Sequence, residues 1–228
     1  MKPNYSDAGL WWKWVIATGA GLGLGLATWP LAMSGAGGIG LIGPLVGFPG
    51  LISAIAMGLV GLFQGLVLRP HLRRANWWFA ATLVGWGVFF GLSYSGAFFF
   101  PYVRLGFGFI TPFVNGDIYS GAEVGLVVGF FQWLVLRQTV KEASWWIAIS
   151  TLGFGLSLPL AAGIGIYRTT LSSNIGYAAN PYITLGESAA VGGILIGAVT
   201  GFGLIWLLHQ RKDQDNVQAA PEPSDNPS

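Results

Sequence analysis

Few residues of this 228-residue chain carry side chains that do chemistry, and their positions limit what that chemistry could be. There is no cysteine, which excludes disulfides, thiolate metal ligands and cysteine nucleophiles. The two histidines, His71 and His209, lie at the ends of apolar runs, where neither could ligate a haem within a run. The sequence has no P-loop, zinc-protease or serine-hydrolase motif. We therefore expect no catalytic residue, no metal site and no bound cofactor.

Glu123 is the acidic residue that lies deepest in an apolar run. A carboxylate inside a membrane is by default a functional candidate, because burying its charge is costly. It could bind a cation or relay a proton. It could also cap the start of a helix, or pair with Arg104 or Arg168. The sequence leaves both interpretations open.

Gln64 and Gln132 each lie five residues before an arginine, Arg69 or Arg137, and Thr200 takes the equivalent place in a third copy. At the helical rise, each amide lies roughly 7–8 Å deeper than its arginine. A buried amide without a partner is costly, so these side chains either clamp neighbouring helices, for about 1–2 kcal/mol, or line a polar cavity. Arg69 and Arg137 are expected to reach lipid phosphates as interfacial anchors.

The elements that position these residues are apolar. Only 9% of the residues are charged and 53% are hydrophobic, whereas a soluble domain has about 25% charged residues. A net charge of +2 gives no basic surface for nucleic acid, so the expected partner is the lipid bilayer. Each apolar run is long enough to cross ~30 Å of hydrocarbon as a helix. These runs cover residues 10–31, 51–68, 77–98, 119–136, 145–166 and 187–208.

The basic residues predict how these six transmembrane helices are oriented. All of the 11 lysines and arginines except Arg104 and Arg168 flank the same ends of the runs. Cytoplasmic loops attract Lys and Arg, so both termini are predicted to be cytoplasmic. The first run could instead be a signal peptide, but it matches later runs, and we interpret it as a retained helix. Paired tryptophans near the cytoplasmic starts of the odd-numbered runs are predicted to be interfacial anchors: Trp11, Trp12, Trp77, Trp78, Trp145 and Trp146.

A tandem repeat organises the chain. GLFQGLVLR at 61–69 matches GFFQWLVLR at 129–137, and the tryptophan pair that follows each segment is in the same register. Aligning the first tryptophan pair with the second would place Gly19 opposite Gly85. The repeats cover about residues 9–74, 75–142 and 143–210, and the polar tail 211–228 is predicted to be disordered. Because each repeat begins and ends on the same side, we predict three parallel hairpins in an all-α, pseudo-threefold membrane bundle.

Small residues recur at every fourth position of the even-numbered helices and so share one helix face. Helices in lipid gain little from burying apolar surface against each other, so close packing at small residues must stabilise the bundle. The glycines predicted to form this packing face are Gly61, Gly65, Gly125, Gly129, Gly193 and Gly197.

The FQWLVLR motif is complete at 131–137, and at 63–69 it has Gly65 in place of its tryptophan. With the tryptophan pair that follows, it resembles uncharacterised multi-pass membrane proteins of bacteria, notably cyanobacteria. The resemblance implies a bacterial inner membrane or a thylakoid, and carries no activity. We expect a structural or interaction module that binds other membrane proteins. The alternatives are a small-solute transporter or channel along the repeat axis, lined by Gln64, Gln132, Thr200 and Glu123, and, third, a membrane enzyme.

Overall fold

The computed structural model describes residues 7–27, 48–95, 118–174 and 181–218. These residues form six α-helices and no strands, which confirms the all-α prediction for this part of the chain. The helices are α1 (Asp7–Ala27), α3 (Phe48–Leu68), α4 (Asn76–Ser95), α6 (Ile118–Leu136), α7 (Trp145–Asn174) and α8 (Pro181–Gln218).

The last two helices are longer than the sequence predicts. α7 continues past residue 166 to Asn174 and contains Pro159. α8 continues to Gln218, so the first part of the tail predicted to be disordered is helical. Its residues 211–218, RKDQDNVQ, contain no proline or glycine, so nothing in them stops a helix that has already formed. Residues 28–31 and 96–98 of the predicted spans, and Arg104 with the outer loop around it, lie outside the described residues.

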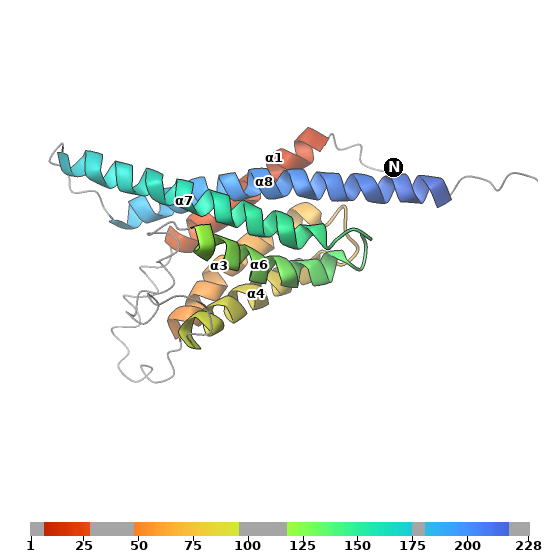
Figure 1. Ribbon diagram of the computed structural model, residues 1–228, viewed down its shortest axis with the longest axis horizontal. Coiled ribbons are helices and arrows are strands. Elements are labelled where there is room, and N and C mark those ends of the chain that lie inside the picture. The colour runs from red at the N-terminus through yellow and green to blue at the C-terminus, as the bar shows by residue number, and fades with distance from the viewer. Residues whose placement is uncertain (1–6, 28–47, 96–117, 175–180, 219–228) are drawn as a thin grey trace, which may run out of the picture.

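The six helices form a closed ring. α1 packs on α3, α3 on α4, α4 on α6, α6 on α7, α7 on α8, and α8 returns to α1. Figure 1 shows that both short turns, 69–75 and 137–144, lie at the same end of the bundle as the start of α1 and the end of α8. We call this the turn end. α7 extends beyond the shorter helices at the opposite end (Figure 1).

Two segments among the described residues are long and apolar enough to cross a membrane: Ile118–Leu136 and Glu187–Arg211. Two further apolar helical segments, Met57–Leu68 and Trp145–Ala161, are shorter.

Candidate functional site: a tryptophan triangle and a polar belt

The interior of the ring is built from residues spaced four apart, so that each helix turns one face inward. This spacing gives three layers. The layer nearest the turn end contains Trp14, Trp78 and Trp146 with Leu68, Leu136 and Leu204. The middle layer is a polar belt made of Thr18, Thr82, Ser150, Gln64, Gln132 and Thr200, all buried. The third layer is apolar again and contains Leu22, Trp86, Phe154, Val60, Val128 and Ile196.

The three tryptophans of the first layer form a triangle at the centre of the ring. Their ring centroids are 5.8 Å apart for Trp14 and Trp78, 5.9 Å for Trp14 and Trp146, and 5.5 Å for Trp78 and Trp146. Every pair packs edge to face, a favoured arrangement of aromatic rings. Because α1, α4 and α7 alternate around the ring, side chains that meet from all three must meet inside it. The triangle therefore fills the bundle axis at this level.

Each glutamine of the polar belt joins three helices. Gln64 on α3 accepts a hydrogen bond from the Trp78 indole on α4 at 3.0 Å. Its amide donates to the Thr18 hydroxyl on α1 at 2.9 Å. Thr18 in turn donates to the backbone carbonyl of Trp14. Both ends of the buried amide are thus satisfied, and the indole N–H has a partner inside the bundle.

The second copy repeats this chain of hydrogen bonds, which we call the relay. Trp146 on α7 donates to Gln132 Oε1 at 3.0 Å, and Gln132 Nε2 donates to the Thr82 hydroxyl at 3.0 Å. Thr82 donates to the carbonyl of Trp78. The two glutamines take the same place in their copies of the repeat, and their geometry matches bond for bond.

The third copy is incomplete. The Trp14 indole donates to Thr200 Oγ1 at 2.9 Å, so α8 is joined to α1. Thr200 Oγ1 donates to the carbonyl of Ile196 in its own helix. Unlike glutamine, threonine has no side-chain amide that could reach α7. Ser150, which takes the place of Thr18 and Thr82, is buried, and its hydroxyl has no hydrogen-bond partner among the described residues.

Glycines of α3, α6 and α8 allow these helices to lie close to the belt residues of their neighbours. A Cβ on Gly61 would lie 2.5 Å from Thr82 Cβ, one on Gly129 would lie 2.7 Å from Ser150 Cβ, and one on Gly197 would lie 3.0 Å from Thr18 Cβ. A real side chain would therefore push away the belt residue of the next helix. The other predicted packing glycines also face neighbours: Gly65 the carbonyl of Ala75, Gly125 the Ser150 backbone and Gly193 the backbone of Thr18 and Gly19.

The structure corrects the repeat register of the first copy. Trp14, and not Trp12, takes the place of Trp78 in the triangle, so Gly21, and not Gly19, is the equivalent of Gly85. The packing agrees, because Gly21 faces Val60 Cα as Gly85 faces Val128 Cα. The spacing Trp-x-x-x-Thr or Trp-x-x-x-Ser, present once in each copy, is the sequence signal for this register.

The tryptophan pairs are not uniform anchors. Trp77 and Trp145 are 64% and 54% exposed, but Trp78 and Trp146 are 0% and 1% exposed. The interpretation of Trp78 and Trp146 as interfacial is therefore wrong, because successive residues of a helix point about 100° apart and only one of each pair can face outward. In the first copy, Trp12 is exposed, whereas the half-buried Trp11 donates to the carbonyl of Ala198 on α8.

The remaining candidates lie away from the belt or at its edge. Arg69 donates to Asn76 Oδ1, and the Arg137 guanidinium lies 5.0 Å from the ring centroid of Trp133. Glu123 is half-buried on α6, nine residues before Gln132, which is about 13 Å along the helix axis. The structure therefore brings Gln64, Gln132 and Thr200 into one belt but does not bring Glu123 to it.

The outer surface of the ring is apolar. Large hydrophobic side chains are exposed on all six helices, including Ile16, Leu62, Val84, Phe130, Leu156 and Phe202. In contrast, the polar side chains of the belt are buried in the interior of the ring. This distribution is the reverse of what a water-soluble bundle requires.

No protein-family model, curated protein or solved structure matches this chain.

Proposed function

We propose that the protein is a six-span membrane protein whose three hairpins surround a pseudo-threefold axis, with both termini in the cytoplasm. The observation that carries this proposal is the inverted polarity of the ring, with an apolar exterior and a hydrogen-bonded interior. A contiguous apolar exterior is stable only against lipid or protein. α1, α3 and α4 have 21, 21 and 20 residues, about 30 Å each, which suits the thickness of a bilayer's hydrocarbon core.

Within that membrane, we propose that the bundle acts as a structural or interaction module. A transporter along the axis would need a wet, polar path. The tryptophan triangle fills the axis on one side of the polar belt, and the apolar layer lies on the other. Within the belt, Gln64 bonds to Thr18 and Gln132 bonds to Thr82, and the tryptophans of the triangle occupy the other ends of the two amides. Function is then left to the outer surface and the two ends of the bundle.

The absence of cysteine makes the topology directly testable. Single cysteines at Arg74 and Lys141 in the two turns, and at exposed Tyr167 on α7, are treated with a membrane-impermeant maleimide in oriented vesicles. We expect Arg74→Cys and Lys141→Cys to react only from the cytoplasmic face and Tyr167→Cys only from the other. Reaction of Arg74→Cys and Lys141→Cys from opposite faces would overturn the proposal.

The interaction role is tested separately by cross-linking in native membranes and purification of the tagged full chain. We expect a specific membrane protein to copurify, and to be lost when the exposed apolar side chains of one helix are exchanged. Recovery of the chain alone, together with solute flux in liposomes that contain only this chain, would contradict this role and favour transport.

A further inference from the structure

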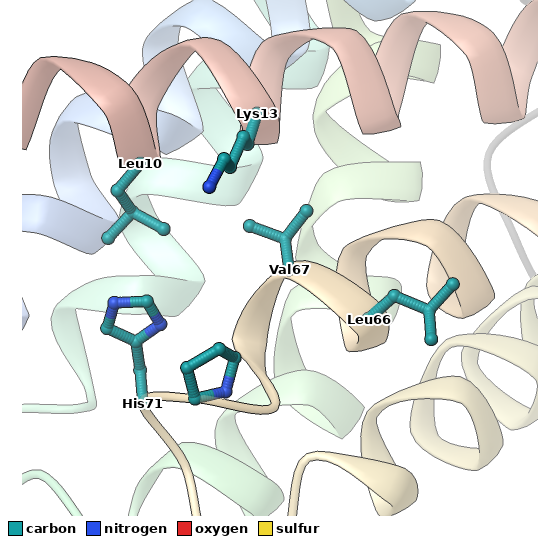
Figure 2. Close-up of a pocket in the computed structure, with 6 residues that line it drawn as sticks. Leu10, Lys13, Leu66, Val67 and His71 are labelled. Carbon is teal, nitrogen blue, oxygen red and sulfur yellow. The ribbon is translucent and has the colours of Figure 1, made fainter. Parts of the chain in front are cut away.

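One pocket at the turn end is not explained by the packing of the bundle. It lies between α1 and the end of α3, has a volume of about 260 Å³, and is lined by Leu10, Lys13, Leu66, Val67, Pro70 and His71. Figure 2 shows the Lys13 side chain pointing from α1 toward the side where His71 and Val67 lie. Pockets that enclose drug-sized molecules are roughly 300–1,000 Å³, so this one suits a smaller group.

The polar groups at this pocket are basic. Lys13 presents an ammonium with three donors, and the half-buried His71 ring can donate an N–H in either of its neutral tautomers. A third basic side chain lies near the pocket without lining it, because Arg211 Nη1 on α8 donates to the backbone carbonyl of His71 at 3.4 Å. Together these groups favour an anion, and a phosphate oxygen is a suitable acceptor for Lys13 and His71.

The pairing of a lysine with a histidine belongs to the first copy alone, although Arg74 takes the place of Leu10 in the second copy. In the register set by the triangle, Lys13 takes the place of Trp77 and Trp145, both exposed, and His71 takes the place of Thr139. Because the other copies pack without a basic pair here, the ring does not require one. The substitution introduces a charge that the fold alone does not explain.

The walls of the pocket select among anions. Leu66 lines the pocket and is also exposed on the outer surface, as is Ile16 one turn further along α1 from Lys13. The pocket therefore adjoins the apolar exterior, where an acyl chain attached to the anion could lie. We infer that this pocket binds the phosphate of an anionic phospholipid from the cytoplasmic leaflet, with Lys13 and His71 as its ligands. The inference rests on the proposed membrane topology.

The test uses the full chain in neutral detergent and native mass spectrometry with phosphatidylglycerol as the probe. We expect tighter retention of phosphatidylglycerol than of phosphatidylcholine with the same acyl chains. Lys13→Gln should weaken phosphatidylglycerol binding roughly five-fold, the usual contribution of one basic side chain near a lipid surface, and Lys13→Arg should retain it. Arg73→Gln is the matched control, since Arg73 is an exposed basic residue of the adjacent turn that does not line the pocket.

Three results would overturn the inference. Equal losses for Lys13→Gln and Arg73→Gln would indicate diffuse attraction and no site. Displacement of the lipid by an equal concentration of inorganic phosphate would indicate a free-phosphate site. Unchanged binding in both Lys13→Gln and His71→Asn would exclude the pocket, provided that both variants unfold at the wild-type temperature. The maleimide labelling above separates these outcomes from a failure of the topology itself, which would move Arg74→Cys or Lys141→Cys to the opposite face.

Discussion

Replacement of Gln132 by methionine tests the polar belt with little change in shape. Methionine has nearly the volume and helix propensity of glutamine, but it cannot replace the amide's two hydrogen bonds. The variant would leave the Trp146 indole without its acceptor and Thr82 without its donor. The backbone of α6 should not be affected.

The expected loss follows from the two bonds, both 3.0 Å long. Side-chain hydrogen bonds between membrane helices contribute about 0.6 kcal/mol on average and up to about 1.7 kcal/mol. Two of them give a loss of about 1–3 kcal/mol, and the indole N–H left buried without a partner moves the value toward the upper end. Gln64→Met should cost the same amount, because Gln64 makes the same two bonds at 2.9 and 3.0 Å.

The measurement is reversible unfolding in mixed micelles, followed by tryptophan fluorescence. Thr200→Val provides an internal comparison, because Thr200 accepts one bond between helices where each glutamine makes two. Its loss should be about half that of Gln132→Met. Gln138→Met, in the exposed turn, is the matched control. Losses below about 0.3 kcal/mol for both glutamine variants would refute the relay as a stabilising feature.

Three further predictions test the packing around the belt, each by the same unfolding assay. Gly129→Leu should prevent stable folding, because its Cβ alone would lie 2.7 Å from a side chain of α7. Gly87→Leu should be tolerated, because nothing lies within 4 Å of a Cβ at that position. Equal expression and stability of the two variants would contradict this prediction. Trp146→Ala should cost about 3–5 kcal/mol and exposed Trp145→Ala under about 1 kcal/mol, and similar losses would argue against the triangle. Thr200→Gln should supply the missing amide of the third copy and stabilise the bundle by about 0.5–1 kcal/mol; a destabilised variant would mean that α8 and α1 lie too close for the longer side chain.

The sequence predicts the helices well because their signal is strong and local. Apolar runs bounded by basic turns place the turn-end boundaries of α3, α6 and α7 within a residue of their observed positions. The recurrence of glutamine at positions 64 and 132 also predicts that the two amides occupy equivalent environments in their copies of the repeat, as the structure shows.

The interior of the bundle is harder to predict, because tryptophan near the start of a helix fits both an interfacial anchor and a buried core. Trp77 and Trp78 are adjacent in sequence, yet one faces out and the other forms the triangle. The four-residue spacing from Trp78 to Thr82 and on to Trp86 identifies Trp78 as the buried member of the pair, because residues at this spacing share the inward face through all three layers. The same spacing from Trp14 to Thr18 identifies the correct register of the first copy.

The first and last helices, α1 and α8, close the ring, and a cross-link between them would detect this contact. The rings of Trp11 on α1 and Phe202 on α8 are 5.3 Å apart, whereas α6, with Phe130 exposed on it, lies three helices away from α1 in both directions. In native membranes, cysteines placed at Trp11 and Phe202 should form an intramolecular cross-link with a short bis-maleimide. Cysteines at Trp11 and Phe130 should not. Cross-linking of both pairs to the same extent, or of neither, would contradict a closed ring of three hairpins.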